Sequence, residues 1–294
     1  MSNYELCCCS TADLNHAWYE HRNIKTVCFH ISIDGVEYPD DMDVTITQEK
    51  MFTEMLAGKE AHSSQVTTGA YIDFWKPFLE AGKDVFHVTL SSGISGTLNS
   101  AMLAKSELES QYPDRRIVVV DSLCGSSGYG MLMDYLADKR DEGYSIDELE
   151  KWALENRTRV HHWVLSTDLT FLIKGGRVKP AAGLLGKMLN ICPIVELCED
   201  GSLKVREKVR GRKKGLAREI ELMEQHADDG LNYSGKCYIC HTEEALGQEL
   251  RRMVEEKFPG VRGKVELLKT GATIAVHLGP GTAVLFFMGD ARGN

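Results

Sequence analysis

A short segment crowded with hydroxyl side chains, residues 91–97 (SSGISGT), is the first stretch whose residue types suggest chemistry. The apolar run before it, residues 85–90, predicts a buried strand, and residues 97–108 predict a helix. A strand-to-helix turn presents backbone amides at the positive end of the helix dipole, so it suits a small anion or a polarised carbonyl. Helix capping, for example by Ser95, is the alternative interpretation, in which these hydroxyls bind no ligand.

Two further segments carry polar groups that could meet such a ligand. Residues 62–69 (HSSQVTTG) combine hydroxyls with an amide just before a predicted helix, although capping by Thr67 or Thr68 explains them as well. His277 precedes the sequence Gly-Pro-Gly, which predicts a sharp turn into a final apolar strand. Structural and functional roles for His277 both stay open.

A glycine-rich segment, residues 171–197, places Arg177 directly after two glycines. The glycines permit close approach of the backbone. Residues 181–189 then predict a helix in which bulky apolar residues alternate with small ones. Either this helix packs in a core or it lines an apolar tunnel, and the candidate lining residues are Leu184, Leu185, Met188 and Leu189.

Positive charge gathers in residues 204–218 of a chain whose net charge is -9. A solvated helix face accounts for such clustering, and contact with phosphate or a protein partner is the functional alternative. Nucleic-acid binding is disfavoured because the chain is acidic and no aromatic residues interleave with the basic ones. The basic residues are Lys204, Arg206, Lys208, Arg210, Arg212, Lys213, Lys214 and Arg218.

Standard catalytic motifs are absent. Residues 93–97 and 125–129 both misplace the second glycine of a nucleophile elbow, and neither a P-loop lysine nor a dinucleotide glycine pattern accompanies the hydroxyl segment. An autonomous hydrolase or acyltransferase that uses Ser95 or Ser127 with His277 is the alternative from another functional class. It lacks an identifiable acid behind the histidine.

Nine cysteines, an odd number, favour reduced thiols over a disulfide framework. Residues 7–9 are three consecutive cysteines at the end of a predicted strand, where neighbours face opposite ways, so packing is the expected role. Residues 237–241 (CYICH) match a haem-attachment pattern, yet they lie in a short apolar run. We expect no metal and no cofactor. The sequence predicts neither a signal peptide nor a membrane span, so a cytoplasmic location is expected.

The order of elements predicts an α/β fold in two domains. Strands at residues 4–9, 26–33, 85–90 and 117–120 alternate with helices at 49–56, 71–80, 97–108 and 128–142, which indicates a parallel sheet in residues 1–160. Residues 161–294 predict an α+β layer that contains a hairpin with Asp200 and Gly201 at its turn. Because ligands of parallel sheets bind at the carboxyl ends of strands, the hydroxyl segment lies at the expected place.

Seven of these stretches, taken together and in order, resemble the DegV family of bacterial fatty-acid-binding proteins. They are STADL (10–14), SSQ (63–65), SSGISGTLNSA (91–101), VVDS (119–122), residues 168–197, KVRGRKKGL (208–216) and HLGPGTAVLFFMGD (277–290). Departures occur at Cys8 and Cys9, where the family motif carries Thr-Asp, at Asn15, where it carries Pro, and at Ser63, where it carries Thr.

The resemblance implies a long-chain fatty acid held between two domains, with no catalytic residue of the chain's own. Its acyl chain would occupy a tunnel, and the protein, expected to act as a monomer, would present the carboxyl group to an ATP-dependent kinase subunit. Arg177 and Arg210 match arginines that contact the partner or its phosphate. The expected carboxyl-binding residues are Ser63, Ser64, Ser95, Gly96, Thr97 and His277. Neutral donors around the carboxyl group would leave it reactive.

Overall fold

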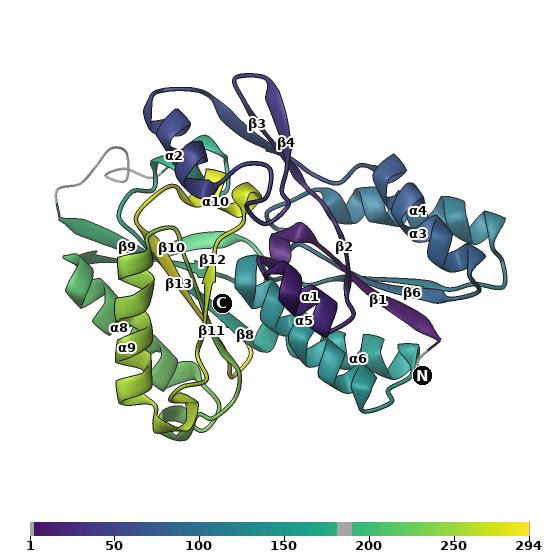
Figure 1. Cartoon of the computed structure of the whole chain (residues 1–294). Coiled ribbons are helices and arrows are strands. Elements are labelled where there is room, and N and C mark those ends of the chain that lie inside the picture. The colour runs from purple at the N-terminus through teal and green to yellow at the C-terminus, as the bar shows by residue number, and fades with distance from the viewer. Residues whose placement is uncertain (1–2, 181–189, 294) are drawn as a thin grey trace.

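A four-stranded parallel sheet forms the core of the N-terminal half in the computed structural model, which describes residues 3–180 and 190–293 (Figure 1). All three strand pairings are parallel, and nearly every residue of β1 and β6 is buried, as expected for strands covered on both faces. The strand order is β2 (Lys25–Val27), β1 (Tyr4–Cys9), β6 (Asp84–Thr89) and β7 (Ile117–Asp121).

Helices cover both faces of this sheet. In Figure 1, α3 (Thr68–Glu80) and α4 (Thr97–Gln111) lie on one face, and α1 (His16–His21), α5 (Ser126–Asp141) and α6 (Ile146–Asn156) lie on the other. Side-chain caps fix where several helices begin: Thr67 caps α3, and Ser145 forms a capping box with Glu148 at the start of α6. The predicted parallel α/β arrangement is confirmed.

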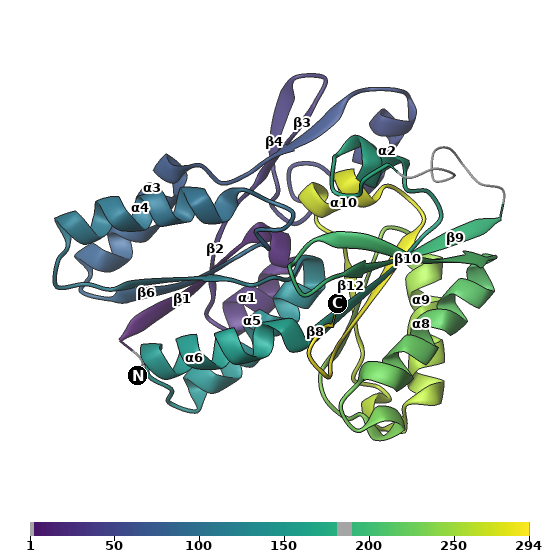
Figure 2. The ribbon, with the colours of Figure 1, turned by 180° about the vertical axis from the view of Figure 1, so that it is seen from behind.

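A six-stranded mixed sheet forms the core of the C-terminal half. It is antiparallel except for the parallel pair β11 and β12. Two helices, α8 (Arg212–His226) and α9 (Glu244–Lys257), cover one face, while α5 packs on the other (Figure 2). The strand order is β10 (Leu203–Arg210), β9 (Ile191–Leu197), β8 (Val160–Ser166), β13 (Thr282–Met288), β11 (Cys237–His241) and β12 (Glu266–Lys269).

Helix α5 joins the two halves, because it packs on β8, β11 and β13 of the second sheet and also bonds to the first. The Tyr129 hydroxyl donates to the carbonyl of Val88 on β6 and accepts the amide of Cys9 on β1 at 3.0 Å. Most residues of α5 are buried, including the polar Ser126 and Ser127. The remaining short elements are η1 (Ser10–Ala12), η2 (Arg157–Arg159), α7 (Thr170–Lys174), η3 (Gly230–Asn232) and η4 (Pro259–Val261).

A third, three-stranded antiparallel sheet corrects the prediction of a single strand at residues 26–33. That segment forms β2 in the parallel sheet and then β3 (His30–Ile33), which pairs with β4 (Val36–Pro39) and β5 (Ala61–Ser64). The chain leaves the first sheet at Phe29, whose amide donates to Ser10 Oγ at 3.0 Å and whose carbonyl accepts the amide of Asp40 at 2.9 Å. These bonds replace the strand pairing that a continuous strand would need.

The small sheet is completed by helices from both ends of the chain. Residues Ile31 and Ile33 of β3 form a separate apolar cluster with α2 (Gln48–Leu56) and α10 (Ala272–Leu278). Helix α10 therefore packs on elements that precede residue 65 although it lies in the last part of the sequence (Figure 1). The division into domains at residue 160, where β8 begins, stays a prediction.

The predicted hairpin at Asp200 and Gly201 connects β9 and β10, and its tip contacts the hydroxyl segment. Ser91 Oγ donates to the carbonyl of Gly201 at 2.8 Å. A Cβ at Gly93 would lie 2.3 Å from the carbonyl carbon of Gly201, so only glycine permits this approach. The β9–β10 hairpin of the C-terminal half thus packs against the hydroxyl segment of the N-terminal half.

Candidate functional site

A cavity of about 440 Å³ lies where the carboxyl ends of the parallel strands meet α7 and α10. This volume falls within the range of roughly 300–1,000 Å³ typical of small-molecule pockets. Its wall combines polar and charged side chains with apolar ones. The lining residues are Phe29, Ser63, Ser64, Gln65, Thr67, Leu90, Ile94, Ser95, Leu172, Arg177, Leu203, Thr273, Ile274, His277 and Leu278.

Ser63 and His277, which both line this cavity, are joined by a hydrogen bond of 2.7 Å between Oγ and Nε2. Ser63 comes from β5 and His277 from α10, so the contact depends on the packing of that helix on the small sheet. Burial lowers the pKa of His277 to about 4, and the nearby charge of Arg177 acts in the same direction. His277 is therefore neutral at physiological pH, so that one ring nitrogen donates a hydrogen bond and the other accepts one.

Arg177 brings a positive charge to this cavity, which corrects the expectation of neutral donors alone. Its Nε donates to the carbonyl of Ile94 at 3.2 Å and its Nη1 to the carbonyl of Gly175 at 2.5 Å. The guanidinium is half-buried, and desolvation lowers its pKa from the ordinary value. The turn at Gly175 and Gly176 after α7 folds back onto the hydroxyl segment, and this contact was not evident from the sequence.

Some hydroxyl side chains of the hydroxyl segment bond to the rest of the protein, and one lines the cavity. Ser92 Oγ donates to Asp121 at 2.5 Å, and Thr97 Oγ1 shares a bond of 2.8 Å with the buried hydroxyl of Tyr71. Ser95 lines the cavity while its Oγ accepts the amide of Thr97 at 3.2 Å. Ser95 is thus the hydroxyl of this segment that lines the cavity, and the N-cap of α4 is Gly96 instead of Ser95.

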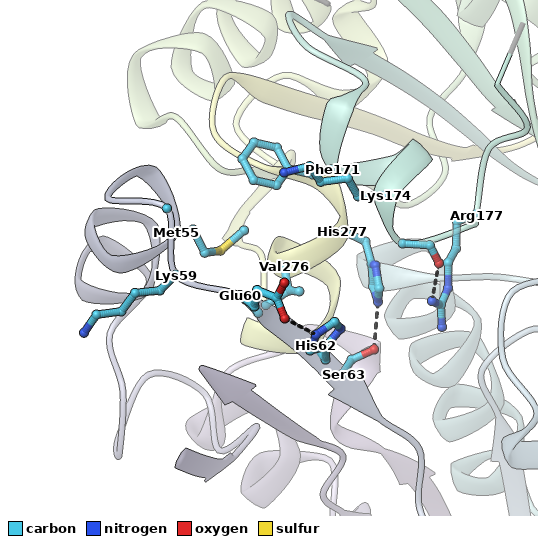
Figure 3. Close-up of a pocket in the computed structure, with 13 residues that line it drawn as sticks. Met55, Lys59, Glu60, His62, Ser63, Phe171, Lys174, Arg177, Val276 and His277 are labelled. Carbon is cyan, nitrogen blue, oxygen red and sulfur yellow. Dashed lines mark hydrogen bonds and ion pairs between the residues drawn. The ribbon is translucent and has the colours of Figure 1, made fainter. Parts of the chain in front are cut away.

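A second cavity, of about 480 Å³, adjoins the first and shares Ser63, Arg177 and His277 with it (Figure 3). In Figure 3 the Ser63–His277 bond separates the side of Arg177 from the side of Glu60 and His62. The second cavity has more charged groups than the first, including Lys59, Glu60 and Lys174. The shared residues therefore lie between an apolar space and a charged one.

The comparisons with known proteins identify the family. A sequence model of the DegV family, described as uncharacterised proteins, matches residues 9–290. The chain belongs to the DegV family. A DegV domain-containing protein of Clostridium perfringens is 30% identical over 284 residues, which cover 96% of each chain.

Solved structures of DegV proteins share the fold. A DegV lipid-binding protein from Thermotoga maritima matches with a TM-score of 0.84 and 26% identity, covering 100% of both chains. A second Thermotoga maritima protein, described as revealing a fatty-acid-binding function, matches with a TM-score of 0.80 and 25% identity over 98% of this chain and 100% of the other. These likenesses agree with the fold expected from the sequence resemblance.

In this DegV protein the predicted site residues do not all reach the cavity. Ser63, Ser64, Ser95 and His277 line it, together with Arg177. Gly96 lies against the side chain of Gln65, and Thr97 faces the core. Arg210, exposed at the end of β10, lines neither cavity. The four predicted tunnel residues, Leu184, Leu185, Met188 and Leu189, lie outside the described residues.

Several lining residues were missed by sequence reasoning, namely Phe29, Leu203, Thr273 and Ile274. A signal existed for two of them, because residues 272–278 are an apolar run that begins after a glycine and forms α10. No local signal marks Phe29 or Leu203, which reach the cavity through tertiary packing.

The Cys9 position, where the DegV motif carries Asp, lies below the hydroxyl segment and outside the cavity. Its thiol is buried and lies 3.3 Å from the hydroxyl of Tyr71, which in turn bonds to Thr97. Burial raises the pKa of the thiol to about 11, so it stays protonated and unreactive at neutral pH. The replacement of Asp by Cys9 therefore changes a residue that supports the hydroxyl segment through Tyr71, and not a residue that lines the cavity.

The remaining cysteine pattern, residues 237–241, forms the buried strand β11. Cys237 and Cys240 are both buried free thiols, and burial raises the pKa of each, to about 12 for Cys240. Both side chains lie in the apolar core. No helix in the described part of the chain is long and apolar enough to cross a bilayer.

Proposed function

We propose that this DegV protein binds one long-chain fatty acid in the 440 Å³ cavity, with the carboxyl group among Ser63, Ser95, Arg177 and His277. The observation that carries the proposal is one cavity whose wall combines the bonded Ser63–His277 pair and Arg177 with seven apolar side chains. The lipid-binding and fatty-acid-binding Thermotoga maritima relatives support the same ligand class. The acyl chain would lie along Leu90, Ile94, Leu172, Leu203, Ile274 and Leu278.

The energetics favour this orientation. Each buried CH₂ contributes about 0.8 kcal/mol, so a sixteen-carbon chain offers on the order of 12 kcal/mol before costs. Burial of an unpaired carboxylate would cost several kcal/mol, and hydroxyl and guanidinium donors offset that cost. The chain therefore supplies affinity, while Ser63, Ser95 and Arg177 supply orientation.

We further propose that the protein presents the bound carboxylate to an ATP-dependent fatty acid kinase subunit. The second cavity lies against the same Ser63–His277 pair. Lys174 and Arg177 in its wall suit the negative charge of a phosphoryl donor, whereas Lys59 is paired with Glu54 and Glu60 adds one negative charge. A carboxylate oxygen would attack the γ-phosphorus, ADP would leave, and an acyl phosphate would form. Arg177 would steady the phosphoryl charge, and Arg210 would contact the partner from the end of β10.

A hydrolase that acts alone fits this site less well. His277 Nε2 contacts Ser63, and within the described residues its Nδ1 has no hydrogen-bond partner, so no carboxylate orients the ring. The other candidate, Ser127, is buried and donates to the carbonyl of Asp13 at 3.2 Å. We therefore propose a binding and presenting protein without catalytic residues of its own.

The lipid proposal is tested by mass spectrometry of an organic extract of the purified protein, followed by titration of delipidated protein with palmitate. We expect a co-purified fatty acid and saturable binding of one palmitate per chain. Absence of both would overturn the proposal. Butyrate serves as the control ligand, because it carries the carboxyl group without the long chain and should bind far more weakly.

The kinase proposal needs a separate assay. Palmitate-loaded protein, a bacterial fatty acid kinase subunit and ATP should together form acyl phosphate, trapped by hydroxylamine as palmitoyl hydroxamate. The loaded protein with ATP alone should form none. Binding without partner-dependent hydroxamate would limit the function to lipid binding, and hydroxamate formation without the partner would contradict the proposal.

A further inference from the structure

Two histidines and an aspartate from separate parts of the chain converge at the end of the second sheet that lies away from α7. His161 is the second residue of β8, His226 is the last residue of α8, and Asp290 follows β13. His161 Nε2 lies 2.9 Å from Asp290 Oδ1, and His226 Nδ1 lies 3.2 Å from the same oxygen. Among the residues that the structure describes, this is the one group of three such side chains whose potential metal-ligand atoms all lie within 4.8 Å of one another.

The backbone around the three residues is held by its own hydrogen bonds. The amide of Asp290 donates to the carbonyl of His226 at 3.0 Å, and the amide of Gly289 donates to the carbonyl of Arg159 at 2.9 Å. Ala227 and Gly289 also form an isolated antiparallel bridge. These bonds hold the backbone of Asp290 beside that of His226 before any ligand binds.

The rings are fixed by stacking. The imidazole of His161 stacks on Phe287 with ring centroids 5.0 Å apart and an interplanar angle of 5°, and on His226 at 5.1 Å and 25°. His161 is buried, whereas His226 is half-buried and Asp290 is exposed, so the group opens to solvent on one side. An ion could enter from that side without unfolding of the strand.

The donor set matches the coordination chemistry of zinc-class ions. Imidazole nitrogen and carboxylate oxygen bind such ions at about 2.0–2.2 Å, which places tetrahedral ligand atoms about 3.3 Å apart. The observed separations of 2.9 and 3.2 Å need only a slight widening. The carbonyl of Asp290, 3.0 Å from His161 Nε2, offers a further oxygen.

Two arginines near the group are engaged elsewhere. Arg292 donates to the carbonyls of Thr158, Leu197, Leu123 and Arg157, and Arg159 forms a bidentate pair with Asp228 at 2.9 Å. Their charges oppose a cation, and the positive field of Arg292 contributes to the lowered pKa of His161. The Asp290 carboxylate and the ligand bonds must offset this repulsion.

We propose that His161, His226 and Asp290 form a site for one divalent transition-metal ion of the zinc class, with water completing its coordination. The ion would tie the segment after β13 to the end of α8 and the start of β8. The site is separate from the proposed lipid cavity, since β8 runs from His161 to Ser166 before the chain reaches α7. Its role would be to strengthen the closure of the second sheet.

The test uses untagged full-length chain treated with a chelator and then dialysed against Zn²⁺. We expect one ion per chain and a higher melting temperature with Zn²⁺. His226→Gln and Asp290→Asn change partly exposed side chains and should fold; each should weaken binding by more than the roughly 10- to 100-fold loss typical of second-shell changes. His21→Gln, at an exposed histidine of α1, is the matched control and should bind as the parent does.

Substitution with Co²⁺ identifies the ligands by spectroscopy. Nitrogen and oxygen ligands should give visible ligand-field bands without a thiolate charge-transfer band, and the bands should vanish in both variants. Three outcomes would overturn the proposal: no stoichiometric ion in the parent chain, undiminished binding in both variants, or a thiolate band that assigns the ion to cysteines. In the first case the three residues form only a hydrogen-bonded cluster.

Discussion

Gly175 lies so close to His277 that any side chain at position 175 would have to displace the imidazole. A Cβ at Gly175 would lie 2.3 Å from His277 Nδ1, well inside van der Waals contact. Gly175 itself has ordinary right-handed backbone angles, so its small size is what the structure requires. The turn after α7 thereby positions the imidazole that bonds to Ser63.

Gly175→Ala should therefore displace His277 and weaken palmitate binding while the fold persists. The neighbouring Gly176→Ala is a matched control, because a Cβ there would meet nothing within 4 Å. Its positive φ of 74° costs roughly 1–2 kcal/mol of stability for alanine but does not touch the imidazole. Palmitate titration and thermal melting of both variants check this; equal loss of affinity in both would contradict it.

Ser63→Ala and Ser95→Ala should each reduce palmitate affinity by about 10- to 100-fold, since a hydrogen bond to a charged group contributes about 1.5–3 kcal/mol. Isothermal titration of delipidated protein measures the change. Ser110→Ala is the control, because Ser110 is exposed near the end of α4 and bonds only to its own helix at Glu107. Unchanged affinity in both site variants would show that the carboxyl group lies elsewhere.

Arg177→Lys should lower palmitate affinity although the charge is retained. The guanidinium bonds to the carbonyls of Ile94 and Gly175 through different nitrogens, a geometry that one ammonium group cannot reproduce. Arg177→Gln should lower affinity further, because it also removes the charge beside the carboxylate. The same titrations would contradict the placement of Arg177 if lysine and glutamine behaved like the parent residue.

Acid should destabilise the protein between pH 6.5 and 4. Burial lowers the pKa of His87 to about 3 and those of His161 and His277 to about 4, against 6.5 when unfolded. Over this range the unfolded chain binds protons that the folded chain does not, so stability falls as pH falls. At pH 5 each histidine should cost on the order of 2 kcal/mol. Because the raised pKa values of Asp13, Asp40 and Glu219 act in the opposite direction, urea unfolding at pH 7.5 and pH 5 is compared between the parent and His277→Gln. The variant should lose less stability at pH 5, and equal losses would contradict the prediction.

Glu219→Met should stabilise the protein at pH 7. Glu219 is buried in α8 close to the backbone of Leu165, and neither carboxyl oxygen has a hydrogen bond of normal geometry among the described residues. Burial raises the pKa of this carboxyl well above its usual range. Methionine has similar size without the desolvation cost, so a gain of about 1–3 kcal/mol in the free energy of unfolding is expected. A loss of stability would indicate a partner for the carboxyl.

The alternating strands and helices of the N-terminal half could be predicted because each element carries its own periodic pattern. The hydroxyl segment could also be placed at a strand end. The small sheet was missed although Asp34 and Gly35, a common hairpin turn, separate β3 from β4. Strand β5 (AHSS) gave no apolar pattern at all, because its residues alternate between half-buried and exposed.

The site itself depends on contacts between distant parts of the chain. Ser63 and His277 stand 214 positions apart, and the fold of α10 onto β5 brings them together. Both lie in segments that the sequence marked as candidates, but only the resemblance to the DegV family assigned them to a carboxyl group, since no local pattern distinguishes a ligand-binding serine or histidine from a structural one. The bond from Arg177 to Ile94 likewise follows from tertiary packing. Because the sequence does not reveal this contact, only neutral groups were expected around the carboxyl group.

The most direct test of the account is the ¹³C NMR spectrum of protein loaded with [1-¹³C]palmitate. We predict one carboxyl resonance, distinct from that of free palmitate, which shifts in Ser63→Ala and in Ser95→Ala but keeps its position in Ser110→Ala. A bound resonance that is identical in all three variants and in the parent chain would contradict the placement of the carboxyl group between Ser63 and Ser95.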